Sequence, residues 1–459
     1  MGDLAKIFKA YDVRGVVPGE LDEAIAEAVG AAFVEVTGAA SVVVAHDMRE
    51  SSPPLAEAFI RGARSRQADV VHTGLGSTDL LYYASGSLGL PGVMFTASHN
   101  PAQYNGMKMC RAGAVPIGGD TGLGEIRDRA AELMGETRDG AAEPAGSAGP
   151  GGSLIEKDLL QGYADHLRTL VDLREIRPLK VVVDAGNGMG GHTVPAVFEG
   201  LPIELVPLYF ELDGNFPNHE ANPLEPQNLV DLQRAVVESG ADLGLAFDGD
   251  ADRCWVIDER GESVSPSAVT ALVAARELAK YPGATIIHNL ITSLGVPEIV
   301  REHGGEPVRT RVGHSFIKAE MARTGAVFGG EHSAHYYFRD FWFADSGMLA
   351  AMHVLAALGE QGRPLSEVAG VYSRYHASGE INSTVSDQAE ALRRVREEFA
   401  GRGEFDELDG LTVTGADWWF NLRASNTEPL LRLNAEAADE SKMTAIRDEV
   451  LAIVGKVSE

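Results

Sequence analysis

Three short apolar runs, each rich in β-branched residues and each ending in a polar turn, constrain the fold of this chain more than any other feature of its sequence. The runs are SVVVAHD (41–47), KVVVDAGNG (180–188) and ATIIHN (284–289). A parallel strand is covered on both faces, and its sequence therefore tends to be continuously apolar. Each of the three runs is thus typical of a buried parallel strand.

A second apolar segment follows each run and leads into a polar loop. These pairs are VMF into TASHNP (93–101), LAF into DGDADR (245–253) and VF into GGEHSAH (327–335). Amphipathic segments such as 54–66 and 230–240 lie between the apolar segments, and alternation of strands with helices predicts three related α/β units with right-handed crossovers. Ligands of open parallel sheets bind beyond the carboxyl ends of the strands, so we expect the three polar loops to form the functional site.

The chain also has recognisable boundaries. At 459 residues it is long enough for three or four domains. The Gly-, Pro- and Ala-rich stretch 135–153 is typical of a linker, and from about residue 371 the pattern changes to that of a smaller α+β domain. We therefore predict an α/β protein with domains at 1–153, 154–256, 257–370 and 371–459.

Charge and cysteine content exclude several classes of partner. The net charge is −28, which repels nucleic acid and anionic lipid, so we expect neither nucleic acid nor membrane as a partner. The two cysteines, Cys110 and Cys254, do not make a disulfide framework and favour a reducing compartment. The first 15 residues lack the apolar core of a signal peptide, and the longest apolar stretch (348–358) is too short to span a bilayer. We expect a cytoplasmic protein.

The sharpest local motif is DGDADR, which supplies Asp248, Asp250 and Asp252. If the segment is extended, alternate side chains share one side, and the three carboxylates repel one another unless a hard cation neutralises them. A calcium EF-hand is disfavoured, although Glu259 stands at the twelfth position, because Arg253 replaces the glycine that the EF-hand loop requires. A solvated acidic turn is the other interpretation, but apolar segments flank the motif on both sides. The motif favours Mg²⁺.

Three further loops carry candidate chemistry, and each has an ordinary turn as its alternative. Ser98 in TASHNP lacks the G-x-S-x-G elbow of hydrolases, but a phosphate on its hydroxyl could complete the coordination of a magnesium ion. In GGEHSAH, Glu331 and Ser333 suit hydrogen bonds to sugar hydroxyls, whereas the spacing of His332 and His335 matches no common zinc pattern. In RASNTEP, an arginine fork with small polar side chains suits a phosphate: Arg423, Ser425, Asn426 and Thr427.

A rival interpretation comes from GNGMGG (186–191), which matches the dinucleotide-binding pattern G-x-G-x-x-G and has Glu211 about twenty residues beyond. A lone match of this kind is weak, and we expect Pro195 to interrupt the helix that should follow. A tight turn at the end of a strand also explains the glycines.

Five motifs in order, FKAYDVRG (8–15), TASHNPAQYNGMK (96–108), DGDADR (248–253), GEHSAH (330–335) and RASNTEP (423–429), resemble the α-D-phosphohexomutase family. The resemblance is greatest to its phosphomannomutase/phosphoglucomutase branch. It implies three related α/β domains around a central cleft and a smaller C-terminal domain that binds phosphate. It also implies a magnesium-dependent mutase that interconverts hexose 1- and 6-phosphates, of mannose or glucose, through a phosphoserine and a hexose 1,6-bisphosphate.

The resemblance assigns a role to each motif. Ser98 would carry the phosphoryl group and, with the three aspartates, bind the metal. The catalytic surroundings would be Arg14, His99, Lys108, Arg253 and His314, with Lys108 and His314 as candidates for proton transfer. The substrate would contact Tyr11, Glu331, Ser333, His335, Arg423, Ser425, Asn426 and Thr427.

Some features depart from the family pattern or leave alternatives open. Ala334 stands where the family usually has glycine, and HNLITS (288–293) lacks a lysine that some relatives have. SNTEP and DGDADR favour the mannose/glucose branch over phosphoglucosamine mutases, which tend to have SGTEP and DGDGDR. A phosphoglucosamine mutase, a dinucleotide-dependent oxidoreductase and a non-catalytic sugar-phosphate-binding protein are the alternatives. The sequence does not predict the oligomeric state.

Overall fold

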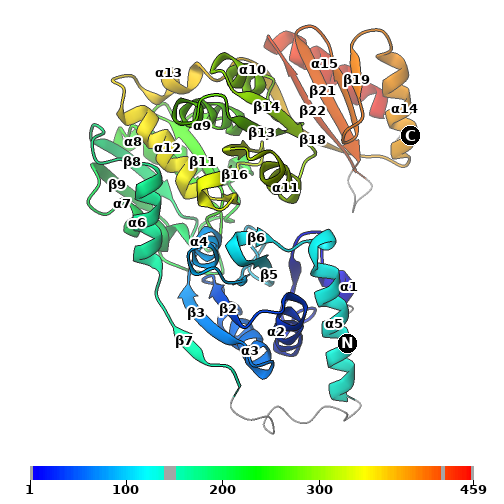
Figure 1. Ribbon diagram of the computed structural model, residues 1–459. Coiled ribbons are helices and arrows are strands. Elements are labelled where there is room, and N and C mark those ends of the chain that lie inside the picture. Colours follow the sequence, from blue (N-terminus) through cyan, green and yellow to red (C-terminus); the bar gives the residue numbers. More distant parts are fainter. Residues whose placement is uncertain (1–3, 139–150, 425–429, 456–459) are drawn as a thin grey trace. The chain divides into compact units, whose positions relative to one another are not determined.

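The computed structural model describes residues 4–138, 151–424 and 430–455 (Figure 1). The chain divides into two compact units. The first unit contains residues 1–264 and 333–366, and the second contains residues 265–332 and 367–459.

The first unit begins with a sheet of strand order β1-β5-β4-β2-β3-β7, to which β6 adds by pairing with β5. Strands β4, β2, β3 and β7 run parallel, whereas β5 is antiparallel to both β4 and β1. The predicted run 41–47 forms the central strand β2, as its continuous apolar sequence indicated. The strands are β1 (Val13–Val16), β2 (Ser41–His46), β3 (Asp69–Leu75), β4 (Gly92–Phe95), β5 (Tyr104–Arg111), β6 (Val115–Pro116) and β7 (Leu154–Glu156).

The helices of this sheet pack closely because glycines stand where two backbones meet. A Cβ on Gly30 would lie 2.2 Å from the carbonyl oxygen of Phe59, and a Cβ on Gly62 would lie 1.9 Å from that of Glu27. The helices are α1 (Leu4–Ile7), α2 (Glu23–Thr37), α3 (Ser52–Ser65), α4 (Thr78–Leu88), α5 (Leu123–Arg138) and the 3₁₀ turns η1 (Ala112–Ala114) and η2 (Gly119–Thr121).

The second sheet of the first unit has the order β12-β11-β10-β8-β9. Strands β10, β8 and β9 are parallel, and β11 returns antiparallel to β10 with Phe247 opposite Cys254. The acidic motif is therefore the connection of a β-hairpin. The elements are α6 (Leu160–Leu170), β8 (Leu179–Asp184), α7 (Gly190–Phe198), β9 (Ile203–Leu208), η3 (Pro226–Leu229), α8 (Val230–Ser239), β10 (Leu243–Phe247), β11 (Cys254–Asp258) and β12 (Ser263–Val264).

Residues 333–366 complete the first unit. Strands β16 (Tyr336–Phe338) and β17 (Ala344–Asp345) pair antiparallel around the turn η4 (Arg339–Phe341). Helix α12 (Gly347–Gly359) contains the longest apolar stretch of the chain and is buried along its whole length. Within the residues that the structure describes, no helix has the length and apolar character needed to cross a bilayer.

The second unit has an α/β part and an α+β part. In the first part, β13 pairs parallel with both β14 and β15. The C-terminal sheet has the order β18-β22-β21-β20-β19 and is antiparallel throughout. The elements are α9 (Pro266–Lys280), β13 (Thr285–Asn289), α10 (Gly295–Glu302), β14 (Glu306–Thr310), α11 (His314–Thr324), β15 (Phe328–Gly330), α13 (Leu365–Gly370), β18 (His376–Thr384), α14 (Gln388–Glu398), β19 (Glu404–Asp406), β20 (Leu411–Thr414), β21 (Trp418–Ala424), β22 (Leu430–Ala437) and α15 (Glu440–Gly455).

Two local expectations, on Pro195 and on the linker, need correction, and two strand pairings were not anticipated. Helix α7 continues through Pro195 instead of stopping there. Helix α5 extends to Arg138, inside the predicted linker. Strand β7 pairs with β3, so the first sheet takes a strand from beyond residue 153, and β12 extends the second sheet to Val264, beyond the predicted boundary at 256. Strand pairing joins segments that are distant in sequence, and composition does not reveal it. The domain boundaries themselves stay a prediction.

Candidate active site

Ser98 lies in the loop between β4 and β5, which we call the serine loop (residues 96–103). Its side chain is buried and its backbone has a φ of 49°, in the left-handed region that non-glycine residues rarely adopt. The backbone N–H of Ser98 donates to Oγ1 of Thr96 at 2.9 Å. The loop is thus held in a conformation that depends on its surroundings.

The hydroxyl of Ser98 points at the acidic motif. Its Oγ donates to Oδ2 of Asp248 at 2.8 Å, although the two residues are 150 positions apart in sequence. The approach of the two loops requires a glycine, because a Cβ on Gly249 would lie 2.3 Å from the carbonyl oxygen of Ser98. The predicted meeting of Ser98 with the acidic motif is therefore present in the first unit.

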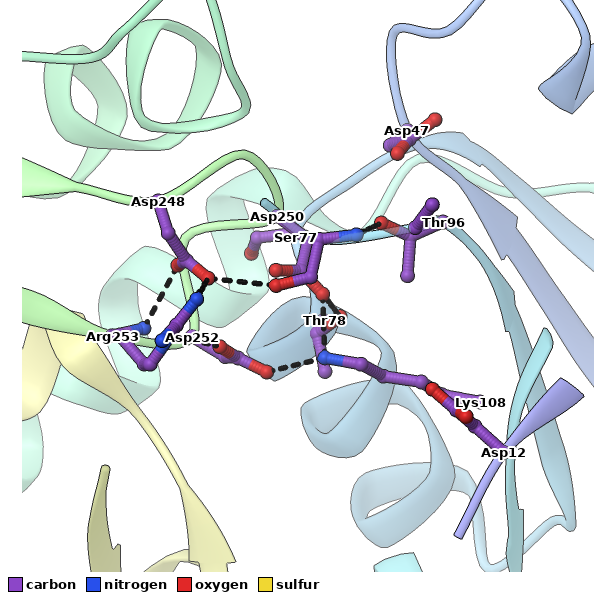
Figure 2. Close-up of polar contacts among 12 residues, drawn as sticks. Asp12, Asp47, Ser77, Thr78, Thr96, Lys108, Asp248, Asp250, Asp252 and Arg253 are labelled. Atoms are coloured by element: carbon purple, nitrogen blue, oxygen red, sulfur yellow. Dashed lines mark hydrogen bonds and ion pairs between the residues drawn. The ribbon is translucent and has the colours of Figure 1, made fainter. Parts of the chain in front are cut away.

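Asp248, Asp250 and Asp252, which we call the acidic trio, are all buried (Figure 2). Their carboxylate oxygens lie within 4.8 Å of one another. The connection is a turn, with Ala251 at φ 59°, and not the extended segment that we expected. The three side chains converge because the hairpin bends. The predicted convergence of the carboxylates is therefore present, but it arises from a turn and not from an extended segment.

An ammonium and a hydroxyl group already contact the acidic trio (Figure 2). Nζ of Lys108 lies 2.6 Å from Oδ2 of Asp250 and 2.5 Å from Oδ2 of Asp252. Thr78, at the start of α4, donates to the same oxygen of Asp250 at 2.6 Å. Among the described residues, Oδ1 of Asp250 and Oδ1 of Asp252 are buried and have no hydrogen-bond partner. Two free carboxylate oxygens in a buried acidic cluster fit a hard divalent cation such as Mg²⁺.

Burial and charge act in opposite directions on these groups. Burial raises the pKa of Asp248, and the charge of Arg253 only partly offsets it. Burial also pushes the pKa of Asp250 upward, but Lys108 outweighs it and holds that pKa below the usual range. The pKa of Lys108 is raised despite burial because of Asp250 and Asp252. Lys108 is therefore a charged ammonium at neutral pH.

Arg253 and His99 form the other side of the site. Nε of Arg253 donates to Oδ2 of Asp248 at 2.9 Å, and a terminal nitrogen of Arg253 lies 2.5 Å from Nδ1 of His99. Since an arginine can only donate, Nδ1 of His99 is the acceptor. Burial, together with the charges of Arg253 and Arg14, lowers the pKa of His99 to about 2. His99 is thus a neutral imidazole, with Nδ1 3.3 Å from Oγ of Ser98.

Arg14 on β1 also joins the site. Its guanidinium donates to the carbonyl oxygen of Ala97 at 2.8 Å and contacts the side chains of Asn100 and Asp12. Tyr11 is half-buried in the bend before β1. These two residues from the first motif therefore lie in the first unit, and Arg14 holds the serine loop directly.

The predicted sugar-binding loop is divided between the two units. In the first unit, Oγ of Ser333 lies 3.0 Å from Nδ1 of His335, and Nε2 of His335 lies 3.9 Å from Oδ1 of Asp252. In the second unit, Glu331 is buried and accepts hydrogen bonds from Asn289 at 3.2 Å and from the backbone of Gly313 at 3.3 Å. His335 thus lies beside the acidic trio.

Arg423 is the one member of the predicted phosphate clamp within the described residues. It lies on β21, where a terminal nitrogen donates to Glu380 at 2.8 Å. Its Nε is buried without a hydrogen-bond partner among the described residues. Ser425, Asn426 and Thr427 lie outside the described residues. His314 is the first residue of α11, and its side chain also lies outside the described part of the chain.

Sequence reasoning missed several residues that position the site, above all Thr78 and the buried pair of Asp47 and Arg49. Asp47 and Arg49 directly follow β2, the first predicted strand, and Arg49 donates to the carbonyl oxygen of Ser98 at 2.9 Å. Two charged residues at the carboxyl end of a parallel strand were the available signal. The glycines of GNGMGG also have a local explanation, because a Cβ on Gly188 would lie 2.7 Å from the carbonyl oxygen of Gly249.

A buried hydroxyl facing a carboxylate cluster and two fixed cations, beyond the ends of parallel strands, is typical of enzymes that transfer phosphoryl groups. Four family models match the chain: phosphoglucomutase/phosphomannomutase α/β/α domain I at residues 5–134, domain II at 161–261, domain III at 265–375 and the C-terminal domain at 380–453.

Individual relatives agree with these matches along nearly the whole chain. A phosphomannomutase of Salmonella montevideo is 41% identical over 456 residues, which is 97% of this chain and 98% of that protein. A Xanthomonas campestris pv. campestris protein named phosphohexose mutases is 41% identical over 448 residues, with the same coverage. The crystal structure of a phosphoglucomutase/phosphomannomutase family protein from Burkholderia thailandensis has 33% identity and a TM-score of 0.87, covering 98% of this chain and 97% of that chain. This chain belongs to the phosphoglucomutase/phosphomannomutase family, and the predicted family and α/β fold class are confirmed.

Proposed function

We propose that this chain is a phosphohexomutase that interconverts the 1- and 6-phosphates of mannose, glucose or both, through a phosphorylated Ser98 and a hexose 1,6-bisphosphate. The enzyme class rests on the relatives, which are named phosphomannomutase and phosphohexose mutases. The observation that carries the chemistry is the 2.8 Å contact between Oγ of Ser98 and Asp248, inside a cluster that also contains Lys108 and Arg253.

In the first step, the bond between phosphorus and Oγ of Ser98 breaks, and a bond forms between phosphorus and the free hydroxyl oxygen of the sugar phosphate. The hydroxyl gives up its proton, and Ser98 recovers one. The charges of Lys108 and Arg253 stabilise the transferring group, while Arg14 holds the loop that bears the serine. The acidic trio would hold Mg²⁺, together with phosphorylated Ser98, and the ion would supply further positive charge for the transfer.

In the second step, the bisphosphate turns around, and a bond forms between Oγ of Ser98 and the phosphorus of its other phosphate while the bond from that phosphorus to the sugar oxygen breaks. Ser98 gives up its proton, and the released sugar oxygen gains one. Because Lys108 is charged, it suits stabilisation of the phosphate and proton donation better than proton abstraction. We therefore assign the role of base to His314, the other candidate from the sequence. His99 is neutral, and its Nδ1 accepts a hydrogen bond from Arg253, so we assign it to orienting that arginine.

Substrate binding is assigned to the two remaining motifs. Glu331, Ser333 and His335 are proposed to bind sugar hydroxyls, and Tyr11 is proposed to contact the substrate. Arg423, Ser425, Asn426 and Thr427 are proposed to clamp the phosphate that does not react. The unsatisfied Nε of Arg423 supports this role, because a guanidinium with a free donor can still bind an anion. The proposed location is the cytoplasm, supported by two buried cysteines, Cys110 and Cys254, that form no disulfide.

Purified protein tests the proposal in a coupled assay with mannose 1-phosphate, glucose 1-phosphate and N-acetylglucosamine 1-phosphate, each with Mg²⁺ and with EDTA. Intact mass and peptide mapping should locate one phosphate on Ser98 after incubation with a hexose 1,6-bisphosphate. We expect turnover of the mannose or glucose substrate that requires Mg²⁺. Turnover of the N-acetylglucosamine substrate alone would indicate an N-acetylglucosamine-phosphate mutase instead, and absence of turnover with all three would contradict the proposal.

A further inference from the structure

Arg49 is a buried arginine outside the predicted site, with 1% of its surface exposed. All five N–H groups of its guanidinium are used. One of them, on Nε, donates to Asp47 at 3.2 Å. The other four donate to backbone carbonyl oxygens at 2.7–2.9 Å, those of Ser98, Asn100, Pro101 and Tyr104.

These four carbonyls all belong to the serine loop and the first residue of β5. A planar guanidinium has donors in a rigid geometry, so it holds four points of one loop at once, which a lysine ammonium cannot do. The Ser98 carbonyl is among them, and the backbone of Ser98 is in the left-handed region. Such a conformation persists only when its surroundings hold it. The four hydrogen bonds from Arg49 supply a large part of the interactions that keep the serine loop in this conformation.

Arg49 is itself fixed from two sides. Asp47 is fully buried, and its other oxygen accepts from the backbone N–H of Arg49 at 3.0 Å and from Ser52 at 2.5 Å. On the opposite side, the ring of Phe216 lies with its centroid 5.2 Å from Cζ of Arg49. A Cβ on Gly214 would lie 2.7 Å from Cα of Arg49, so the chain at Gly214 packs directly on the arginine.

Gly214 and Phe216 belong to a loop after β9, which we call the bracing loop (residues 213–219). Its ends are anchored to the last residue of β8 and to the turn that follows this strand. Nε2 of His219 lies 2.9 Å from Oδ2 of buried Asp184, and the backbone N–H of Asp213 donates to the carbonyl of Asn187 at 3.0 Å. The bracing loop therefore connects the second sheet of the first unit to the arginine that holds the serine loop.

We propose that Arg49 is a positioning residue for phosphoryl transfer, which fixes Oγ of Ser98 opposite the acidic trio and is kept in place by the bracing loop. This role rests on the function proposed for Ser98. Arg49 is buried and all its donors are occupied, so it contacts neither the sugar nor its phosphates. Its loss should therefore reduce the rate of transfer while leaving substrate affinity nearly unchanged.

The test uses Arg49→Lys, which keeps the charge beside Asp47 and loses the fork. Since a displacement of about 1 Å in a reacting group costs on the order of 100-fold, we expect kcat to fall at least about tenfold while KM stays within about twofold. Amide hydrogen exchange in peptides covering 96–105 should become about tenfold faster, because the loop opens locally. The phosphate on Ser98 should also be lost to water faster than in the unchanged protein.

Arg168→Lys is the matched control. Arg168 also donates its guanidinium to three backbone carbonyls, those of Ala196, Val197 and Glu199, but these lie at the end of α7 and not in the serine loop. The Arg168→Lys variant should leave kcat and amide hydrogen exchange in 96–105 unchanged. Phe216→Leu removes the ring over Arg49 and keeps an apolar side chain. It should reduce kcat by a few fold, and it keeps the test open if Arg49→Lys fails to fold.

The inference would be overturned if kcat of both Arg49→Lys and Phe216→Leu stayed within twofold of the unchanged protein, or if kcat fell while exchange in 96–105 was unaltered. A rise in KM that accounts for the whole loss of activity would also contradict it. If the unchanged protein itself showed no mutase turnover, the proposed function would fail. Hydrogen exchange in 96–105 would then still decide whether Arg49 holds the loop.

Discussion

At the scale of single residues, Ser98 is suited to carry a phosphate because fixed cations and fixed acceptors surround it. Its hydroxyl faces Asp248, and the neighbouring Arg253 contacts both Asp248 and His99. Each of these side chains is buried or half-buried and paired, so little reorganisation accompanies the transfer. Preorganised charge of this kind is the main source of catalysis for phosphoryl transfer.

The first prediction concerns Ser98→Ala. The variant removes the atom that accepts the phosphoryl group, so we expect kcat to fall by at least about 1,000-fold. It also removes one buried hydrogen bond, so the free energy of unfolding should fall by only about 1 kcal/mol. Steady-state kinetics and urea denaturation would check the two effects. Mutase rates close to those of the unchanged protein would rule out Ser98 as the phosphate carrier.

The second prediction concerns the charge of Lys108. In Lys108→Met, Asp250 and Asp252 lose their counter-charge, so in EDTA we expect the free energy of unfolding to fall by about 3 kcal/mol. Added Mg²⁺ should restore most of that loss, because a bound divalent cation replaces the ammonium. Thermal melts with and without Mg²⁺ would measure this. Lys157→Met, at an exposed lysine after β7, is the control and should respond little to either condition. Equal loss of stability with and without Mg²⁺ would argue against a cation site.

The third prediction concerns Ala334, which stands where the family usually has glycine, and the backbone conformation there explains that preference for glycine. Ala334 has a φ of 62°, where alanine is strained by about 1–2 kcal/mol and glycine is not. Ala334→Gly should therefore stabilise the protein by about 0.5–1 kcal/mol, after the entropy of the unfolded chain is allowed for. Ala351→Gly within helix α12 is the matched control and should destabilise it by about 1 kcal/mol. Chemical denaturation compares them, and the same sign in both variants would refute the explanation.

At the scale of elements, the site depends on the meeting of the serine loop with the β10–β11 hairpin. The serine loop connects two strands of the first sheet and the hairpin two strands of the second sheet, and each follows the carboxyl end of a strand. The backbones approach so closely that only glycine fits at position 249. The distance between Ser98 and the acidic trio is therefore set by backbone packing as well as by the side chains.

The fourth prediction tests this contact with Gly249→Ala. The added methyl group would lie 2.3 Å from the carbonyl oxygen of Ser98, so the loops must separate. We expect kcat to fall about 100-fold, since the reacting groups are displaced. Gly135→Ala in α5 is the control, because a Cβ there meets no atom within 4 Å. Kinetics and thermal melts of both variants would be compared. Retention of full activity by Gly249→Ala would show that the approach of the two loops is unimportant.

At the scale of the whole molecule, the dominant property is the net charge of −28. A phosphorylated substrate must approach against this field, and the local cations Arg14, Lys108 and Arg253 reverse it only at short range. The buried cores are otherwise ordinary, with aromatic clusters such as Phe33, Phe59 and Phe95 under the first sheet. Added salt should therefore weaken the long-range repulsion that arises from the net charge, and it should affect the packing of the apolar cores much less.

The fifth prediction follows from that field. Raising NaCl from 10 to 300 mM shortens the Debye length from about 30 Å to less than 8 Å. Repulsion among the surface carboxylates is then screened, and we expect the thermal midpoint to rise by a few degrees. Scanning calorimetry in a buffer of constant pH would measure it. A midpoint that falls steadily with NaCl would mean that surface ion pairs stabilise the fold more than the net charge destabilises it.

The sequence alone determined the α/β class, the strand runs at 41–47, 180–188 and 284–289, the family and the loops that bear the chemistry. These features are local, because strand burial, turn residues and motif composition are expressed within about ten consecutive residues. The loop positions and the family resemblance both indicated that Ser98 and the acidic motif share one site, whereas the direct contact of Ser98 with Asp248 and its geometry came from the fold.

Only the tertiary structure decided the roles of Arg49, Thr78 and the bracing loop. Their partners lie tens to hundreds of positions away, and a planar guanidinium binding four carbonyls leaves no periodic or compositional trace in the sequence. The same reason explains why the pairing of β7 with β3 was not predicted and why the acidic hairpin was expected to be extended. Chain composition specifies which groups are available, whereas packing between distant segments decides which of them meet.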